Sequence, residues 1–219
     1  MAFRAAIFDL DGVLVDSARL HFVAWKRIAD ELGIMFSEHD NEALKGVDRM
    51  GSLDHILALG ELRLDLTAKE ELAGRKNGYY LDALATMSDA DVLPGARSLL
   101  SCARTAGLRL GIASASRNAT MVLERAGLSG AVDFVADAAQ VARSKPAPDI
   151  FLACASALGV APGDCVGFED AAAGVSAIKA AGMIAVGIGA SDILAEADLV
   201  FESTVQVDLD RVLRLSPGA

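Results

Sequence analysis

Residues 5–17, AAIFDLDGVLVDS, contain the pattern that decides the fold. Ala5 to Phe8 are all apolar, and Asp9 and Asp11 follow, separated by one residue, with Gly12 directly after them. A short continuous apolar run is typical of a strand that is buried on both faces of a parallel sheet. The stretch therefore predicts a buried strand that carries two carboxylates out of its carboxyl end.

The chain from about Val92 onward repeats strand and helix signals. Strands are predicted at 108–113, 134–136, 165–168 and 184–188, and helices between them end at Gly107, Gly127, Gly159 and Ala181, the last of them stopped by Gly182. Asp149 is predicted to cap the helix that ends at Gly159. Repeated strand–helix units imply right-handed crossovers, so the predicted fold is α/β with a doubly wound parallel sheet.

Between Ser17 and Asp91 the sequence predicts helices and no strand. The expected helices run from Ser17, as N-cap, to Gly33, from Ser37 toward Leu44, over Met50–Leu59, and from a Thr67–Glu70 capping box to about Leu84. We therefore expect an α/β core made of residues 1–15 and 92–219. A helical cap, residues 16–91, is inserted after the first strand.

The composition limits the partners. Of 219 residues 53% are hydrophobic and 23% are charged, which argues against disorder, and the formal net charge is −10. A chain this acidic is poorly suited to bind the phosphate backbone of a nucleic acid. We therefore expect no nucleic-acid partner. An anionic small molecule would have to be held by a few local cations.

The cysteines and the N-terminal region predict a cytoplasmic protein. Cys102, Cys154 and Cys165 form no CxxC pair, which indicates reduced thiols in apolar surroundings. Charged residues interrupt the apolar N-terminal stretch too early for a signal peptide, and no run approaches the ~20 apolar residues of a membrane span. No membrane partner is expected.

Polar side chains follow each of the central predicted strands. Ser114, Ala115 and Ser116 follow residues 108–113, Lys145 lies in the loop after 134–136, and Glu169 and Asp170 follow 165–168. Each taken alone is compatible with a turn or a helix cap. Ligands of open parallel sheets bind outside the carboxyl ends of the strands, so we expect these residues to share one crevice with Asp9 and Asp11.

The residue types in this crevice suit phosphoryl transfer. Clustered carboxylates repel one another unless a cation is shared, and an oxygen-rich set without Cys or clustered His favours Mg²⁺. The metal and Lys145 can neutralise phosphoryl oxygens. One aspartate can then attack phosphorus while the other acts as general acid and base.

The segments FDLDGVLVDS, ASAS, KPAPDIF and GFEDAAAG, in this order, resemble the haloacid dehalogenase superfamily. The resemblance implies that Asp9 is the nucleophile and Asp11 the general acid and base. It implies that Ser114 and Lys145 hold the transferring phosphoryl group. The magnesium ligands would be Asp9, the backbone carbonyl of Asp11, and Asp170, with Glu169 close by.

The inserted helices are similar to the cap of glucose-phosphate mutases in this superfamily, through LHFVAWKRIADELGI, LKGVDRMGSLDHIL, RKNGYY and DVLPG. This resemblance implies roles for cap and core residues near the sugar phosphate. His21 would couple cap closure to Asp11, with Lys76 near it. The sugar pocket would include Lys45, Gly46 and Val47, and the substrate would also face Arg49 and Ser52, with Arg49 on the phosphate that is not transferred. The core residues that would assist are Ala115, Ser116, Arg117 and Asn118. Arg117 stands where lysine is frequent, which leaves fine specificity open.

The implied function is a Mg²⁺-dependent, monomeric enzyme that interconverts β-D-glucose 1-phosphate and D-glucose 6-phosphate. It would use an aspartyl-phosphate and β-glucose 1,6-bisphosphate. A sugar-phosphate phosphatase of the same superfamily, which hands the phosphoryl group to water, is the first alternative. A phospho-aspartate signalling domain is a more distant one, since it needs neither a cap nor a general base.

Overall fold

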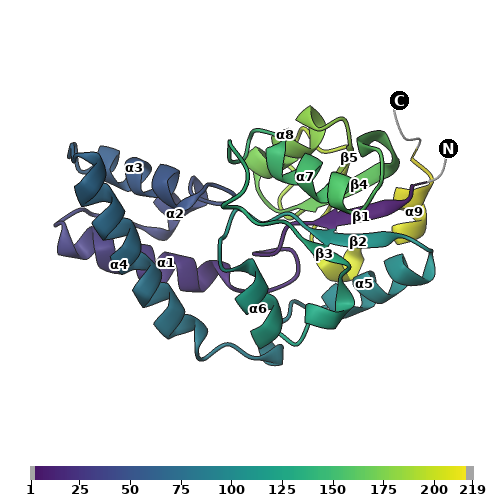
Figure 1. Cartoon of the computed structure of the whole chain (residues 1–219), viewed down its shortest axis with the longest axis horizontal. Helices are drawn as coiled ribbons and strands as arrows, with labels where there is room; N and C mark the ends of the chain where they lie inside the picture. Colours follow the sequence, from purple (N-terminus) through teal and green to yellow (C-terminus); the bar gives the residue numbers. More distant parts are fainter. Residues whose placement is uncertain (1–2, 216–219) are drawn as a thin grey trace.

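The computed structural model describes residues 3–215 and contains a parallel sheet of six strands in the order β3-β2-β1-β4-β5-β6 (Figure 1). The strands are β1 (Ala5–Phe8), β2 (Arg109–Ile112), β3 (Phe134–Val135), β4 (Cys165–Glu169), β5 (Ile184–Ile188) and β6 (Leu199–Phe201). β1 lies between β2 and β4, with Ala5 opposite both Arg109 and Cys165. The doubly wound parallel sheet is confirmed. The carboxyl end of β1 lies where the strand order changes direction, which is where such sheets bind ligands.

Both faces of β1 are buried, as the apolar run predicts. Ala6 and Phe8 pack into one apolar core, and Ala5 and Ile7 pack into another on the opposite face of the sheet. The ring of Phe8 stacks on that of Phe168 with 4.7 Å between centroids. Burial of each large apolar side chain stabilises the fold by about 1.5–3 kcal/mol, so this strand anchors the residues that follow it.

Helices cover the two faces of the sheet. α5 (Ala96–Thr105), α6 (Ala119–Arg125) and α9 (Leu209–Leu213) share the core of Phe8, and α7 (Asp149–Ala157) and α8 (Ala172–Ala180) share that of Ile7 (Figure 1). Short 3-10 helices lie at Asp89–Asp91, Ser129–Ala131, Pro162–Asp164 and Thr204–Gln206. The strand β6 is not among the predicted strands, because its three residues are too short a run to show a period.

Between β1 and α5 the described chain forms helices and no strand. These are α1 (Ala18–Glu31), α2 (Glu38–Glu42), α3 (Arg49–Leu59) and α4 (Leu66–Leu84), followed by the 3-10 helix at 89–91. They extend away from the sheet (Figure 1) and enclose an apolar core of their own, which includes Trp25, Ile28, Leu53 and Leu72. We call this helical segment the cap.

Several predicted helix ends are wrong in detail. Asp65, not Thr67, caps α4, and its carboxylate accepts a hydrogen bond from the backbone N–H of Ala68. α7 begins at Asp149 itself, whose carboxylate pairs with Arg143 instead of capping the helix. Ser37 does cap α2, but that helix ends at Glu42, short of Leu44.

The three cysteines are free, which agrees with the prediction of reduced thiols. Cys154 and Cys165 are buried, whereas Cys102 is exposed on α5. The prediction of apolar surroundings is therefore wrong for Cys102. Within residues 3–215 no helix combines the length and the apolar character needed to cross a membrane.

Candidate active site

Lys145 joins the carboxyl ends of β1 and β4. Its Nζ atom lies 2.6 Å from Oδ1 of Asp9 and 2.8 Å from Oε2 of Glu169, and all three side chains are buried. Burial by itself lowers the pKa of Lys145, but the carboxylates of Asp9 and Glu169 outweigh burial and raise it. The ammonium therefore stays charged beneath the site, and it partly neutralises the carboxylates around it.

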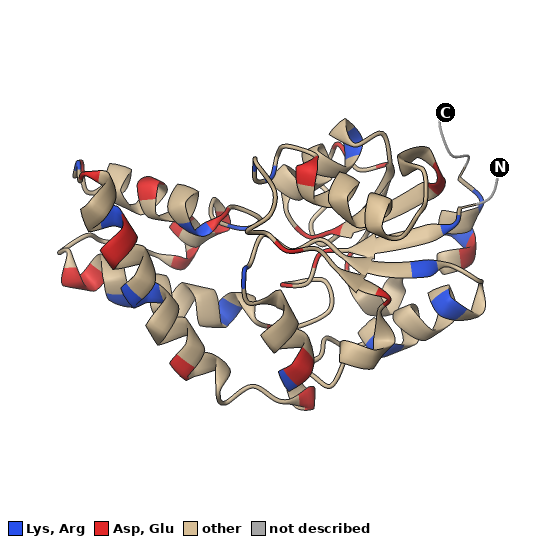
Figure 2. Ribbon diagram, in the orientation of Figure 1, with Lys and Arg blue, Asp and Glu red and all other residues tan. Residues whose placement is uncertain are grey.

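Asp9, Glu169 and Asp170 form the acidic group of the site. Each offers a carboxylate oxygen, and the three atoms lie within 4.8 Å of one another. Burial, and then the charge of Asp9, raise the pKa of Asp170 to about 7 and raise the pKa of Glu169 well above its usual range. Figure 2 shows acidic positions gathered in the middle of the molecule, where the strands end.

This donor set fits Mg²⁺. The ion prefers hard carboxylate oxygens, and the raised pKa values show that one lysine does not balance the crowded carboxylates. The carboxylate of Asp11 does not belong to this group.

Two glycines permit this crowding. Gly12 has φ +85°, and a Cβ atom there would lie 2.1 Å from Oδ2 of Asp170. A Cβ atom on Gly174 would lie 2.0 Å from Cδ of Glu169. Any larger residue at either position would push a carboxylate out of the acidic group.

The carboxylate of Asp11 is not a member of the acidic group and accepts hydrogen bonds from two hydroxyls. The hydroxyl of Ser17 donates to Oδ1 of Asp11, and that of Ser114 donates to Oδ2 at 3.4 Å. Burial, and then the charge of Asp9, raise the pKa of Asp11 to about 6, while the Ser17 bond opposes this shift. Such a pKa suits a group that accepts and returns a proton near neutral pH.

Contrary to the prediction from the sequence, the hydroxyl of Ser17 does not cap the helix that follows it. The residue occupies the N-cap position of α1, but no hydrogen bond from this helix reaches its side chain within the described structure. Its hydroxyl binds Asp11 instead. A serine at a helix start is usually interpreted as a cap, so the sequence carried no signal for this second role.

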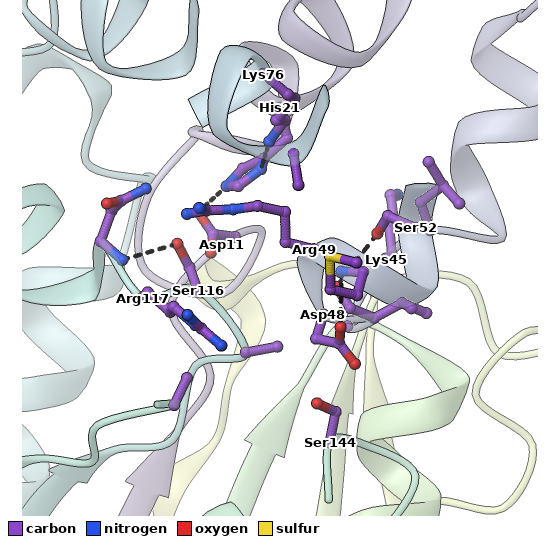
Figure 3. Close-up of a pocket in the computed structure, with 18 of the residues that line it drawn as sticks. Asp11, His21, Lys45, Asp48, Arg49, Ser52, Lys76, Ser116, Arg117 and Ser144 are labelled. Carbon is purple, nitrogen blue, oxygen red and sulfur yellow. Dashed lines mark hydrogen bonds and ion pairs between the residues drawn. The ribbon is translucent and has the colours of Figure 1, made fainter. Parts of the chain in front are cut away.

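His21 and Lys76 lie above Asp11, on α1 and α4 of the cap (Figure 3). Lys76 Nζ is 2.8 Å from Nδ1 of His21, and Nε2 of His21 is 4.0 Å from Oδ1 of Asp11. Burial, then Lys76 and then Arg49, lower the pKa of His21 well below its usual range. Burial, and then Arg49, lower the pKa of Lys76 to about 7. The two cap residues thus connect to Asp11 without adding a fixed second charge.

A cavity of about 550 Å³ opens between the cap and the carboxyl ends of the strands. It is lined by fourteen of the predicted site residues: Asp9, Asp11, His21, Lys45, Gly46, Val47, Arg49, Ser52, Lys76, Ala115, Ser116, Arg117, Asn118 and Asp170. The other three, Ser114, Lys145 and Glu169, are buried and do not line the cavity in the described structure. Figure 3 shows the side chain of Arg49 extending into this space.

Two further residues that line the cavity, one from the cap and one from the core, face each other. Asp48 caps α3 through the backbone N–H groups of Met50 and Gly51, and it faces Ser144 of the core (Figure 3). Burial opposes the charge of Asp48, but hydrogen bonds, first that of Ser144, and the nearby Arg117 lower its pKa overall. The sequence analysis missed Asp48 and Ser144, although the helix-cap signal of Asp48 before α3 was available.

Asn77 is the other residue that the sequence analysis missed. It follows Lys76 on α4, and its side-chain oxygen accepts hydrogen bonds from Arg49 and Asn118. Nothing in the local pattern of a polar helix distinguishes this asparagine, because its partners lie 28 and 41 residues away.

Comparison with known proteins matches residues 3–182 to the family of haloacid dehalogenase-like hydrolases. The chain is 43% identical over 209 residues to the β-phosphoglucomutase of Bacillus subtilis, which covers 94% of this chain and 92% of the relative. The crystal structure of β-phosphoglucomutase from Clostridium difficile superposes with a TM-score of 0.93 at 42% identity, covering 96% of this chain and 95% of that one. The fructose-1-phosphate phosphatase YqaB of Escherichia coli is 33% identical, over 85% of this chain and 96% of the relative.

Proposed function

Because the chain belongs to the haloacid dehalogenase-like hydrolase family, we propose that it is a β-phosphoglucomutase. The reaction interconverts β-D-glucose 1-phosphate and D-glucose 6-phosphate. The observation that carries the proposal is a cavity with a different group at each end: Asp9, paired with the buried Lys145, lies in the core, and Arg49 of the cap lies near Arg117. A bisphosphorylated sugar needs both ends, whereas a single phosphate needs one.

Asp9 would act as nucleophile and phosphoryl carrier. In the phosphorylated enzyme, the bond between phosphorus and the Asp9 oxygen breaks as a sugar hydroxyl oxygen bonds to phosphorus. Lys145 and Ser114 would hold the phosphoryl oxygens during the transfer, because both are buried next to Asp9 and Asp11. Magnesium held by Asp9, Asp170 and the Asp11 carbonyl, with Glu169 beside them, would supply positive charge for the transferring phosphoryl group.

Asp11 would take the proton from the attacking sugar hydroxyl and return it in the reverse half-reaction. Its raised pKa of about 6 matches that dual task. The bisphosphate formed in the first half would turn over and return its other phosphate to Asp9. Arg49 would hold the distal phosphate in both orientations.

The cap would ensure that the phosphoryl group passes from Asp9 to the sugar and not to water. Lys45, Gly46, Val47 and Ser52 line its part of the cavity and would contact the sugar. His21 and Lys76 would bring Asp11 into its working position when the cap closes. A site that is completed only around bound sugar protects an aspartyl-phosphate from hydrolysis.

We also propose the division into an α/β core of residues 1–15 and 92–219 and a cap of residues 16–91. The separate apolar core of α1–α4 supports it. A monomer in the cytoplasm remains the prediction for assembly and compartment.

The test is a coupled assay with purified protein, Mg²⁺ and β-glucose 1-phosphate, primed with a trace of β-glucose 1,6-bisphosphate. Glucose 6-phosphate and free phosphate are followed side by side. We expect glucose 6-phosphate with little free phosphate, no turnover by Asp9→Ala, and wild-type turnover by Asp192→Ala, a change at an exposed site.

A sugar-phosphate phosphatase is the second candidate, and the 33% identity to a fructose-1-phosphate phosphatase favours keeping it. Free phosphate without glucose 6-phosphate in the same assay would assign the chain to that activity. The signalling-domain alternative loses its support, because the chain belongs to a hydrolase family and its acidic group lies under a cap.

A further inference from the structure

The side-chain oxygen of Asn77 accepts hydrogen bonds from both sides of the cavity. Nη2 of Arg49 donates to it at 2.7 Å, and Nδ2 of Asn118 donates to it at 2.9 Å. Arg49 is the first residue of α3, Asn77 lies on α4, and Asn118 occupies the N-cap position of α6. One amide oxygen therefore connects two cap helices to the core.

Asn77 lies behind its two partners. Arg49 and Asn118 line the cavity, while Asn77 is not one of the described residues that line it. A ligand in the cavity would therefore contact the guanidinium of Arg49 and the amide of Asn118, and it would sense Asn77 only through them.

Arg49 needs such support before a ligand arrives. Burial, and then the nearby Arg117, lower its pKa, which means that the charged guanidinium is held in an unfavourable place. Without an anion between them, the two arginines repel each other. The bond to Asn77 gives the guanidinium a fixed partner on the cap side.

Asn77 is a neutral partner for Arg49, and its neutrality preserves the positive charge of the site. An amide oxygen can orient Arg49 and Asn118 without cancelling the positive charge that attracts a phosphate. A carboxylate in the same place would accept the same two bonds, but it would pair with Arg49 as a competing anion.

We propose that Asn77 is a positioning residue that orients Arg49 and Asn118 for the phosphate that is not transferred. This inference rests on the proposed function, since it assigns Arg49 to the distal phosphate of a sugar phosphate. The Asn77–Asn118 bond also ties the cap to the core, so the distal-phosphate site is complete only while the two are in contact.

Steady-state kinetics of the full-length protein test the inference. Asn77→Ala should raise KM for β-glucose 1-phosphate about tenfold while kcat changes less, because the lost interaction serves the bound and the reacting sugar phosphate alike. Asn77→Asp, nearly identical in shape, should also raise KM, because its charge competes for Arg49. Asp82→Ala, a change at an exposed residue of the same helix, is the matched control and should keep the wild-type KM.

A double variant shows whether Asn77 works through Arg49. In an Arg49→Ala background, Asn77→Ala should raise KM less than about twofold further, because the charged group that it orients is gone and only the neutral amide of Asn118 is left. An unchanged KM in Asn77→Ala, wild-type behaviour of Asn77→Asp, or a full additional effect in the Arg49→Ala background would overturn the inference.

A failure of this inference can be distinguished from a failure of the proposed function. If the wild-type protein released free phosphate and made no glucose 6-phosphate, the mutase proposal would fail. The same KM comparison, followed by phosphate release, would then still decide whether Asn77 positions Arg49.

Discussion

The ammonium of Lys76 lies 2.8 Å from Nδ1 of His21, and both side chains belong to the cap, whereas Asp11, 4.0 Å from Nε2 of His21, belongs to the core. Lys76 is buried, close to the rings of Trp25 and Tyr80. Burial, and then Arg49, lower its pKa to about 7, so its charge changes within the physiological range.

The first prediction concerns pH. Because the folded-state pKa of Lys76 is lowered to about 7, the ammonium is present below that pH and is lost above it. Only the charged form attracts the carboxylate of Asp11, to which Lys76 connects through His21, so kcat/KM for the sugar phosphate should fall as pH rises through about 7. Lys76→Met should have a lower kcat/KM with no decline in this range.

The comparison uses the same substrate at the same pH values, so that the ionisation of the sugar phosphate cancels. A wild-type profile above pH 7 that matches that of Lys76→Met would contradict the role assigned to Lys76.

The second prediction separates the two ends of the cavity. Arg49→Ala should reduce formation of glucose 6-phosphate by about tenfold or more, since a charged hydrogen bond to phosphate contributes about 1.5–3 kcal/mol. Release of free phosphate from a phosphorylated Asp9 should change much less, because Lys145 and Asp9 remain paired. The measurement is the ratio of the two products.

Arg75→Ala is the control for this variant, because Arg75 lies on α4 and pairs with Glu31 on the cap surface. Intact mutase activity in Arg49→Ala would refute the assignment of Arg49 to the distal phosphate.

The third prediction concerns metal binding. Mg²⁺ should raise the thermal midpoint of unfolding, because a cation between Asp9, Glu169 and Asp170 relieves their repulsion in the folded state. At a hundredfold excess over its dissociation constant, the ion stabilises by about 2.7 kcal/mol. Asp170→Asn should lose most of this shift, and a chelator should abolish it.

The shift should also shrink on acidification through about pH 7, where Asp170 takes up a proton and competes with the metal. The same shift in Asp170→Asn as in the wild type would show that the ion binds elsewhere.

The fourth prediction tests the close approach of Gly12 to the acidic group. Gly12→Ala should weaken Mg²⁺-dependent stabilisation and turnover together, because its Cβ would lie 2.1 Å from Oδ2 of Asp170 and φ is +85°. Gly182→Ala is the matched control, since that glycine has φ +74° but no described atom within 4 Å of the position that its Cβ would take. It should lose stability through backbone strain while keeping its response to the ion.

Much of the core could be predicted from local sequence. The apolar run of Ala5 to Phe8 predicts a buried strand because four successive apolar residues satisfy both faces of a parallel sheet, and the structure buries all four. Asp9 then has to leave the end of that strand, and the carboxyl ends of parallel strands meet at one edge. The shared crevice follows from these rules, whereas the strand order β3-β2-β1-β4-β5-β6 was not predicted.

Helix ends and short elements were less predictable. Asp65 and Thr67 are both acceptable caps two residues apart, and only the geometry of the preceding loop selects Asp65. β6 has three residues, and it is a strand because β5 offers it a parallel neighbour. Such choices depend on contacts that a local pattern does not contain.

What the sequence by itself determined is most of the helices and strands and the chemical groups at the strand ends, because backbone propensity, apolar periodicity and strand-end position are local properties. What only the tertiary structure decided is which groups pair. The hydroxyl of Ser17 binds Asp11 rather than its own helix, Lys145 bridges Asp9 and Glu169, and the amide of Asn77 joins Arg49 to Asn118. Each of these bonds joins segments that are distant in the sequence, and its geometry exists only after those segments have packed against each other.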